Sequence, residues 1–559
     1  MSIGDLVTRS YAGFRGVDFR GEEVALVRSP DSVNMWKNYR DIEGICTRPG
    51  TVKLSDYTEP IWGIFHYEVG NVELELVHSG VKLYKVFNGE RTVLYTGLNP
   101  RKSTSFVYNN IWYFKDGINY LQYDGQTIEE VQGYVPTTSI GRKPAGGGTT
   151  YESVNMLTGE RKNTFLADGV STEYYLDTQN IDMVTPVVKV NGVSVNGFTL
   201  NREKGLVVFN EAPPEPLTDG QDNVEIRFRK TVGGYRDRIN NCTLLQVFDN
   251  RVFFSGNPDY PNTVWHSSLN DPTYCSDLDF YNEGLDMAAV KGLVAGNNAL
   301  WVFKEPSQAN TTVFYHNPAI DSVEGKIYPS VHSSIYAGCI GAAINFNDDI
   351  VFFSNRGMEA ISGDVMTEQV LAHRSSLVDR KLMEEPDYEN MSLIEWEGYL
   401  LVFVGNKVYL ADSRAKHTIE NHYEYEWFYW ELEEKVTCVS VYKEVLYIGT
   451  EKGIYTMAEQ GDIESYWITP VDKFKHPQNL KRTNKKGCIV EAVGDVDVWA
   501  KTNKSEWKNY GEYKEITDYF TARIQEKKFK DVQLKFSSAT RFRLESVVLE
   551  CFIGGYIKR

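Results

Sequence analysis

The sequence predicts an all-β protein whose largest part is a β-propeller of about seven blades. One pattern recurs seven times: an alternating apolar run, a tight Asn/Asp/Gly turn, an aromatic-rich run, another turn and a third run. The recurrences begin roughly 45–50 residues apart, which is close to the length of a four-stranded propeller blade. Aromatic residues make up 13% of the chain, which favours strands over helices.

The predicted blades are these seven recurrences. They span residues 62–86, 106–123, 244–265, 290–315, 341–362, 392–410 and 436–457. A single three- or four-stranded meander cannot bury its apolar face, whereas a ring of such sheets can. Two stacked β-sandwiches with similar hairpins are the alternative to a propeller.

Two-residue turns separate the strands within each predicted blade. In residues 106–123, Asn109-Asn110 and Asp116-Gly117 can adopt the positive φ angles of tight hairpin turns. The same positions in four later blades are occupied by Asp249-Asn250, Asn297-Asn298, Asp348-Asp349 and Glu397-Gly398. Each pair therefore predicts a hairpin between two strands.

We divide the chain into four parts on this basis. Residues 1–60 are an N-terminal segment that we expect to contribute strands to the propeller or to contacts within a ring. Residues 61–135 together with 233–462 form the propeller. Residues 136–232 form an inserted β-sandwich, and residues 463–559 form a C-terminal β-domain.

The inserted domain follows from about 95 extra residues between the second and third blades. Val135-Pro136 ends the second blade, and Lys143–Gly148 is rich in turn-forming residues. Residues 164–229 then hold four or more strand-like runs with Asp-Gly and Asn-Gly turns. Gly233-Gly234 provides a hinge back into the propeller.

The C-terminal β-domain differs from the rest of the chain in charge. Its predicted strands are Val496–Ala500, Tyr519–Ile524, Val532–Phe536 and Phe542–Phe552. Residues 463–559 contain 19 Lys/Arg against 13 Asp/Glu, a balance of +6, which leaves 40 against 63, or −23, for residues 1–462. A body this acidic argues against ordinary nucleic-acid binding, which needs a basic face. It suits a surface along which DNA slides without sticking, although acidic charge also simply keeps a large protein soluble.

The sequence contains no run of about 18 apolar residues, so we expect no membrane span. The first residues lack the apolar core of a signal peptide. The seven cysteines are scattered singly without a C-x-x-C pair, and we interpret them as reduced thiols of the core.

The residues predict no catalytic, cofactor-binding or metal-binding site. The nine histidines form no H-E-x-x-H motif, and no G-x-S-x-G or phosphate-binding G-x-x-x-x-G-K-[ST] motif occurs. Paired carboxylates of a glycosidase remain an alternative, because Asp348, Asp349, Glu395 and Glu397 lie near predicted turns. Carboxylates are common in turns for backbone reasons alone.

Several short motifs, taken in order, resemble the tail nozzle and head-to-tail stabilisation proteins of short-tailed phages. The motifs are Ser32–Trp36, Cys46–Gly50, Arg251–Pro258, Asp259–Ser267, Asp271-Pro272, Gly338–Gly341, Phe352–Gly357, Phe529–Phe536 and Gly554–Lys558. The inserted segment, with Gly146–Gly148 and Val190–Gly192, also resembles a module of phage virion proteins. No single motif is diagnostic, and the resemblance lies in their order over most of the chain.

The resemblance implies a structural virion protein of the tail that is made in the cytoplasm of the bacterial host. It implies a homo-oligomeric ring, a hexamer, around the DNA channel, in contact with portal and adaptor ring proteins and with other tail proteins. Genome DNA would pass through the channel without sequence-specific contacts. The family supplies no catalytic residues and no cofactor, and the chain is shorter than many nozzle proteins.

Two other functions stay open on the sequence. The first is a receptor-binding or carbohydrate-binding propeller at the tail tip, in which aromatic clusters would stack on sugars. The second is a glycan-cleaving depolymerase, although such enzymes more often contain β-helix repeats than propeller blades.

Overall fold

The computed structural model describes residues 5–21, 24–38, 44–70, 72–309, 312–322, 325–333, 335–362, 370–419 and 422–556. Lys558 of the terminal motif lies outside these residues. The chain divides into two compact units, which are treated separately below. The first unit comprises residues 1–66, 77–80 and 337–559, and the second comprises residues 67–76 and 81–336.

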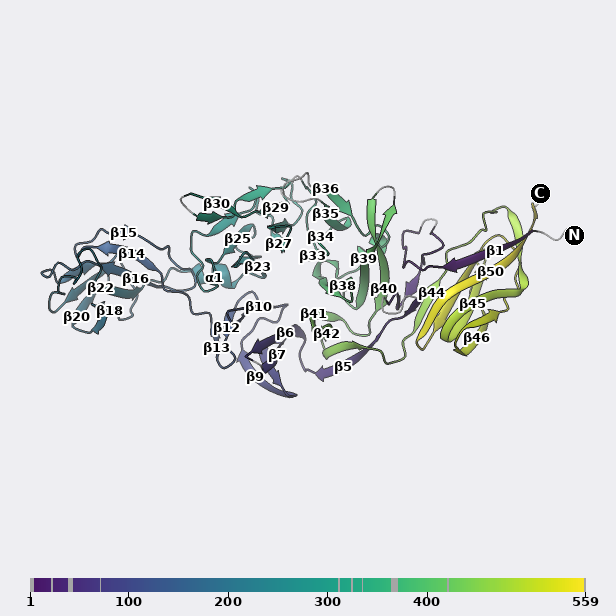
Figure 1. Cartoon of the computed structure of the whole chain (residues 1–559), viewed down its shortest axis with the longest axis horizontal. Helices are drawn as coiled ribbons and strands as arrows, with labels where there is room; N and C mark the ends of the chain where they lie inside the picture. Colours follow the sequence, from purple (N-terminus) through teal and green to yellow (C-terminus); the bar gives the residue numbers. More distant parts are fainter. Residues whose placement is uncertain are drawn as a thin grey trace. The chain divides into compact units, whose positions relative to one another are not determined.

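Seven successive groups of four antiparallel strands, six of them separate sheets and one of them part of a 15-stranded sheet, make the protein an all-β, propeller-containing fold, as the sequence predicts (Figure 1). The first sheet contains β6 (Ile61–Val69), β7 (Val72–Ser79), β8 (Lys82–Phe87) and β9 (Glu90–Thr96), and the second contains β10 (Thr104–Tyr108), β11 (Ile111–Lys115), β12 (Tyr120–Tyr123) and β13 (Ile128–Glu130). The third contains β23 (Leu244–Phe248), β24 (Arg251–Ser255), β25 (Thr263–His266) and β26 (Phe280–Asn282). The fourth contains β27 (Val290–Gly296), β28 (Ala299–Lys304), β29 (Val313–His316) and β32 (Ser330–His332).

The last three sheets lie in the first unit. Their strands are β33 (Ala343–Phe346), β34 (Asp349–Ser354), β35 (Gly357–Ser362) and β36 (Val370–His373); β37 (Ser392–Trp396), β38 (Tyr399–Val404), β39 (Lys407–Ile419) and β40 (His422–Glu431); β41 (Val436–Tyr442), β42 (Val445–Thr450), β43 (Gly453–Ala458) and β5 (Gly50–Asp56). The last sheet is completed by β5 from the N-terminal segment, which pairs antiparallel with β43. In Figure 1, purple β5 lies at the edge of the sheet that contains the green strands β41 and β42.

The hairpin turns have the geometry that their residues favour. Asn109 and Asn110 have φ angles of 49° and 60°, and Asn297 and Asn298 have 51° and 59°. The predicted turn Asp348-Asp349 is wrong by one residue. Phe346 pairs with Asp349, so the two-residue loop is Asn347-Asp348, in which asparagine accepts the left-handed conformation readily.

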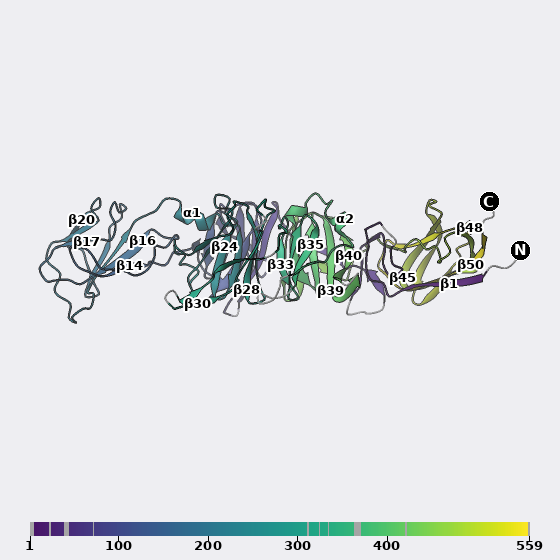
Figure 2. The same cartoon turned by 90° about the horizontal axis from the view of Figure 1, so that it is seen from above.

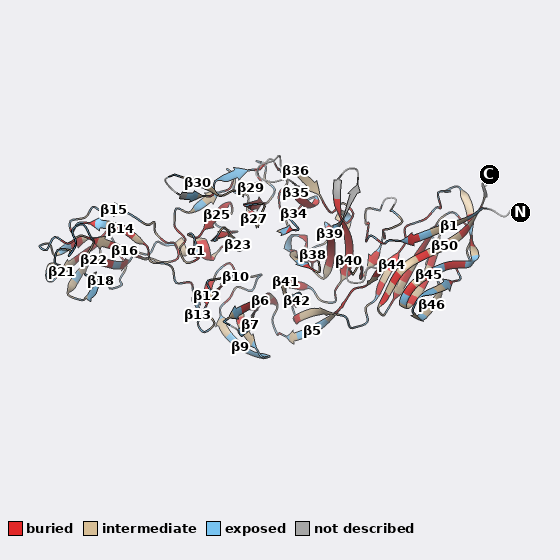
Figure 3. Cartoon of the chain, in the orientation of Figure 1, coloured by how far each residue is buried: buried red, intermediate tan, exposed pale blue. Residues whose placement is uncertain are grey.

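Apolar side chains fill the space between neighbouring sheets. In the second unit, Tyr113 and Tyr120 pack with Phe254 and Trp265 of the next sheet. In the first unit, the sheets β33–β36 and β37–β40 share a core, whose members include Val351, Phe353, Leu400, Val402 and Trp427. In Figure 3, much of β38 and β40 is red, the colour of buried residues.

The inserted domain contains two sheets. One has six strands in the order β15 (Thr149–Thr150), β14 (Thr137–Arg142), β16 (Glu160–Phe165), β22 (Val224–Arg229), β18 (Val187–Val190) and β19 (Val193–Val195), and the other has β17 (Glu173–Tyr175), β21 (Leu206–Phe209) and β20 (Phe198–Asn201). Phe165, Tyr174, Val207, Phe209 and Ile226 are buried in its core. The domain is a β-sandwich, and a type I′-like Asn191-Gly192 turn, with φ angles of 49° and 79°, connects β18 to β19.

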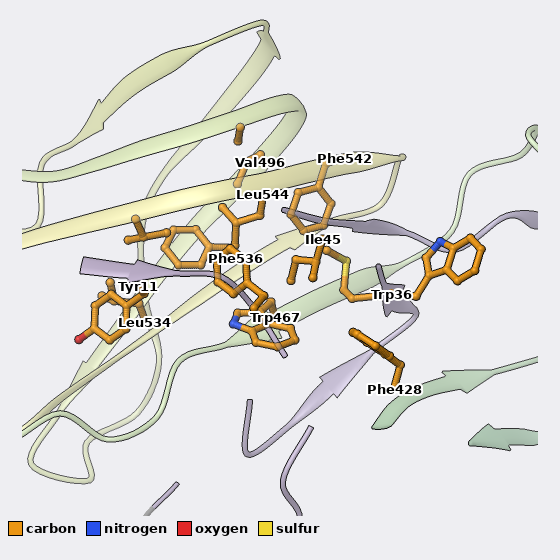
Figure 4. Packing of buried hydrophobic residues seen from close by; sticks show 14 of the residues in the cluster. Tyr11, Trp36, Ile45, Phe428, Trp467, Val496, Leu534, Phe536, Phe542 and Leu544 are labelled. Atoms are coloured by element: carbon orange, nitrogen blue, oxygen red, sulfur yellow. The ribbon is translucent and has the colours of Figure 1, made fainter. Parts of the chain in front are cut away.

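The C-terminal domain is built around one long strand. Its strands are β44 (Ser465–Ile468), β45 (Asn479–Thr502), β46 (Lys508–Ile516), β47 (Tyr519–Ala522), β48 (Lys527–Phe529), β49 (Val532–Ser538) and β50 (Phe542–Tyr556). β45 pairs with β46, β47, β48, β49 and β50 along its length. Its core includes Trp467, Val496, Leu534, Phe536 and Leu544 (Figure 4).

The N-terminal segment runs through this part of the fold. β1 (Asp5–Ala12) pairs along its full length with β50, and the two strands lie side by side in Figures 1 and 2. β2 (Ser32–Val33) pairs with β44, and β3 (Met35–Trp36) pairs with β4 (Ile45–Thr47) and with β40. The first 60 residues therefore supply strands to the propeller and to the C-terminal domain.

Candidate functional site

Residues of the first two motifs of the sequence form a buried network of hydrogen bonds. Arg48 Nε donates a hydrogen bond of 2.9 Å to Oδ1 of Asn34, and Arg48 Nη2 donates one of 2.9 Å to the Glu431 carbonyl oxygen. Asn34 Oδ1 also accepts a hydrogen bond from the Glu431 backbone N–H at 2.9 Å. Burial lowers the pKa of Arg48 to about 10. This network joins the N-terminal segment to β40, so its role is structural.

The motifs Arg251–Pro258 and Asp271-Pro272 also serve the fold. Asn257 is buried, and its side-chain amide donates hydrogen bonds to the carbonyl oxygens of Asp237 and Arg238 at 3.2 and 2.9 Å. Asp271 Oδ1 accepts hydrogen bonds from the Thr273 backbone and hydroxyl. These polar residues hold turns around β24 and β25 and do not point to a reaction.

The four carboxylates of the glycosidase alternative have different surroundings. Asp349 Oδ2 accepts hydrogen bonds from the Tyr425 hydroxyl at 2.5 Å and from Arg374 at 3.3 Å. Asp348 occupies the β33–β34 turn, and Glu395 is exposed on β37. Glu397 lines a pocket of about 320 Å³ together with Glu444. The structure does not bring all four carboxylates to one pocket.

Two clusters of histidine and carboxylate side chains consist of residue types that are common in active sites. Glu283 lies 2.8 Å from His316 Nε2 with both side chains inaccessible, and His373 lies between Glu359 and Asp379. Burial lowers the pKa of His373, but hydrogen bonds and charges of Asp379 and Glu359 outweigh burial and raise this pKa to about 10. A histidine held protonated by two carboxylates is an ion-pair anchor and a poor general base.

The described residues contain no group of three His, Cys, Asp or Glu side chains that could hold a metal ion. No helix in the described part of the chain is long and apolar enough to cross a bilayer. Six cysteines are buried and Cys46 is half-buried, which confirms most of them as core thiols.

A polar and aromatic pocket of about 630 Å³ lies in the second unit. Its lining includes Arg251, His266, Asp279, Tyr281, Lys326 and Tyr328. Burial raises the pKa of Asp279 to about 6 and lowers that of His266 to about 4. The guanidinium of Arg251 lies 5.4 Å from the centroid of the Tyr328 ring. Rings beside a carboxylate and a guanidinium are a combination that can bind a polar ligand.

The inserted sandwich exposes an unusual number of large apolar side chains. Leu217, Met183, Val170 and Val193 are 95%, 85%, 82% and 69% exposed. Single exposed apolar residues are ordinary, but several on one small domain are typical of a surface that contacts another protein.

The C-terminal domain contains a surface that the sequence analysis missed. Arg482, Lys485 and Lys486 on β45 lie beside Arg523 and Lys527, because β45 pairs with β47 and β48. The sequence runs KRTNKK and RIQEKK show two basic segments. Only the strand pairing shows that they form one surface.

No protein-family model and no curated protein sequence matches the chain. Solved structures align with low scores. BamB from Moraxella catarrhalis is 10% identical over 74% of this chain and 96% of its own, with a TM-score of 0.32. The dihydro-heme d1 dehydrogenase NirN is 9% identical over 86% of this chain and 79% of its own, with a TM-score of 0.33.

An exo-beta-1,3-galactanase from Phanerochaete chrysosporium is 10% identical over 55% of this chain and 94% of its own, with a TM-score of 0.23. At these scores, none of the three alignments transfers an activity, a ligand or a partner to this chain.

Proposed function

We propose that this chain is a structural subunit of the tail of a short-tailed phage, a nozzle or head-to-tail connector. Its subunits form a ring, of six copies by the resemblance, around the DNA channel, retain the packaged genome and then conduct it during ejection. The observation that carries the proposal is the ordered set of phage-like motifs along most of the chain. The subunit is made in the host cytoplasm and resides in the virion tail.

Two features of the fold support this proposal. The motif residues Asn34, Arg48, Asn257 and Asp271 hold strands and turns together, which suits a protein whose function is mechanical. The exposed apolar side chains of the inserted sandwich suit contacts with the portal and adaptor proteins.

The charge of the chain fits a DNA conduit. Residues 1–462 carry a balance of −23, and an acidic channel wall would repel the phosphate backbone so that DNA passes with little friction. Changing channel-facing Asp/Glu to Lys should slow ejection from assembled particles, and unchanged ejection would count against this role of the charge.

Electron microscopy with light-scattering mass tests the proposal directly. The purified chain is examined alone and with portal and adaptor rings of a short-tailed phage. Rings with a central channel, alone or only with these partners, are the expected result. A monomer that ignores both partners overturns the proposal.

A virion carbohydrate-binding propeller is the second candidate, and the pocket around Asp279 and Tyr328 favours it. This function predicts saturable binding on a glycan array. The variant Asp279→Asn should abolish that binding while the protein stays folded.

A further inference from the structure

We propose that a cationic surface on the C-terminal domain binds an acidic surface on the propeller of a second copy of this chain, head to tail. This inference deepens the proposed function, since it names the contact through which the subunits of a ring would join. Its two surfaces are defined below from their residues.

The cationic surface has six members on two adjacent segments. They are Arg482, Lys485, Lys486, Arg523, Lys527 and Lys528. Arg482 pairs with Lys527 at one end, and Cys488 pairs with Ala522 at the other. The residues between these two pairs therefore lie next to each other, although about 40 residues separate them in sequence.

A bulge in β45 presents the lysines of this surface. The pairing of β45 with β50 shifts register between Thr483 and Cys488. Thr483 Oγ1 donates a hydrogen bond of 2.6 Å to the Ile524 carbonyl oxygen and accepts one of 2.9 Å from the Glu526 backbone N–H. At Gly487, with φ +67°, a Cβ would lie 2.3 Å from the Ala522 carbonyl oxygen. The bulge is thus packed against its neighbour.

The charges of the cationic surface are not neutralised within the chain. All six side chains are exposed, and within the described ranges none of them takes part in a salt bridge. The nearby carboxylate of Glu526 is bound by Lys508, and that of Glu550 accepts a hydrogen bond from Asn484. Six cations held on one rigid surface favour an anionic partner.

Three apolar side chains are also exposed on the outer face of the same sheet. They are Leu6, Ile489 and Tyr519, which are 50%, 43% and 62% exposed. Arg482 lies over the Phe552 ring at 4.8 Å, and Leu6 pairs with Phe552. Apolar groups beside charged ones are typical of protein–protein interfaces, whereas DNA-binding surfaces are more uniformly polar and cationic. These exposed apolar side chains therefore favour a protein partner over DNA.

The chain carries a complementary acidic surface on its propeller. Glu384, Glu389 and Glu433 are exposed there, and in the part of the chain that the structure describes no salt bridge involves them. Asp387 joins the two segments, because its carboxylate lies 3.0 Å from Lys435 Nζ. The acidic surface is therefore built from residues 384–389 and 433–435.

A second copy is the occupant that the charges favour. No salt bridge among the described residues joins the two surfaces within one chain. Residues 463–559 carry +6 and residues 1–462 carry −23, so the C-terminal domain of one copy is attracted to the body of the next. A contact between two different surfaces repeats from copy to copy, and it closes into a ring when the rotation permits.

Charge reversal on the full-length chain tests the contact. The basic variant is Lys485→Glu with Lys486→Glu, the acidic variant is Glu384→Lys with Glu433→Lys, and the swap combines all four changes. Lys143→Glu with Lys204→Glu, both exposed on the inserted domain, is the control with the same change in charge as the basic variant. Self-association is measured by sedimentation velocity at low and high salt, and all proteins are checked for native circular dichroism.

The proposal predicts that the basic and acidic variants each weaken self-association at least about tenfold, that the swap restores it to within about threefold, and that the control is unchanged. High salt should weaken the wild type. A wild type that does not associate, or a swap that fails to recover, overturns the contact.

A 30-base-pair DNA duplex serves as the competing ligand. Loss of DNA binding in the basic variant with unchanged self-association would assign the cationic surface to nucleic acid and overturn the proposal. Closed rings that tolerate every reversal would also overturn it but leave the proposed function standing. Salt-sensitive open chains would uphold the contact and reject the closed ring.

Discussion

The carboxylate of Glu283 lies 2.8 Å from Nε2 of His316, and neither side chain reaches solvent. The other ring nitrogen of His316 lies 2.9 Å from the Tyr328 carbonyl oxygen, and Ser330 donates a hydrogen bond to Glu283. This pair joins the strand end after β26 to β29 and β32. It ties two neighbouring propeller sheets together through polar contacts.

Removing Glu283 should therefore destabilise the propeller strongly. Glu283→Ala leaves His316 and Ser330 without their acceptor in a buried site, and we expect a loss of about 3–5 kcal/mol. The measurement is the opening free energy of β29 from hydrogen exchange. Glu90→Ala, at an exposed position, should change it by less than about 0.5 kcal/mol. A similar small effect of Glu283→Ala would show that the pair contributes little.

Two glycines of the N-terminal segment should respond differently to alanine. At Gly16, with φ +92°, a Cβ would lie 2.0 Å from the Trp427 carbonyl oxygen, whereas at Gly13, with φ +65°, it would meet nothing within 4 Å. Gly13→Ala should cost about 1–2 kcal/mol for the left-handed conformation, and Gly16→Ala about 3 kcal/mol because a clash is added. Thermal unfolding of both variants checks the order, and equal costs would contradict the close contact.

The His373 cluster predicts a pH dependence of stability. The folded-state pKa of His373 is raised to about 10, above the value near 6.5 of an unfolded chain. The stabilisation is therefore complete below pH 6.5 and is lost as the pH rises toward 10. His373→Gln should destabilise the protein at pH 6 by about 1–3 kcal/mol and have less effect at pH 10. A cost independent of pH would show that this histidine is not charged in the fold.

Asp472 should anchor the first strand to the C-terminal domain. Its carboxylate accepts hydrogen bonds from Arg9 Nε at 2.6 Å and from the Tyr11 hydroxyl at 3.0 Å, and it is almost fully buried. Asp472→Ala should raise hydrogen exchange along β1 by an amount equivalent to about 2–4 kcal/mol. The matched variant Asp462→Ala, at an exposed loop position, should leave β1 unchanged. Unchanged hydrogen exchange along β1 in both variants would show that Asp472 does not anchor this strand.

Local patterns predicted the fold class because the blades are made of short hairpins. Alternating apolar residues and an Asn-rich turn such as Asn109-Asn110 specify a hairpin within about 20 residues of sequence. The shifted turn at Asn347-Asp348 shows the limit of this reasoning, since three adjacent turn-forming residues permit two registers. Only the pairing of Phe346 with Asp349 selects one of them.

Long-range pairings could not be predicted in the same way. The first nine residues of β45 read NLKRTNKKG, whose polar residues show no period of two. They form a strand because β50 and β48 pair with them. The cationic surface was missed for the same reason. Its two halves become neighbours only through that pairing.

The paired strands β5 and β43 are synthesised at widely separated times. Asp56 is opposite Gly453, about 400 residues later, and at the usual rate of translation the second strand emerges roughly 20–80 s after the first. During that interval the backbone of β5 on the nascent chain is not yet paired with β43. Its own Lys53 and Asp56 are charges of the kind that discourage a strand edge from joining another polypeptide. The last sheet thus depends on a strand that must remain solvated until about 400 further residues have been translated.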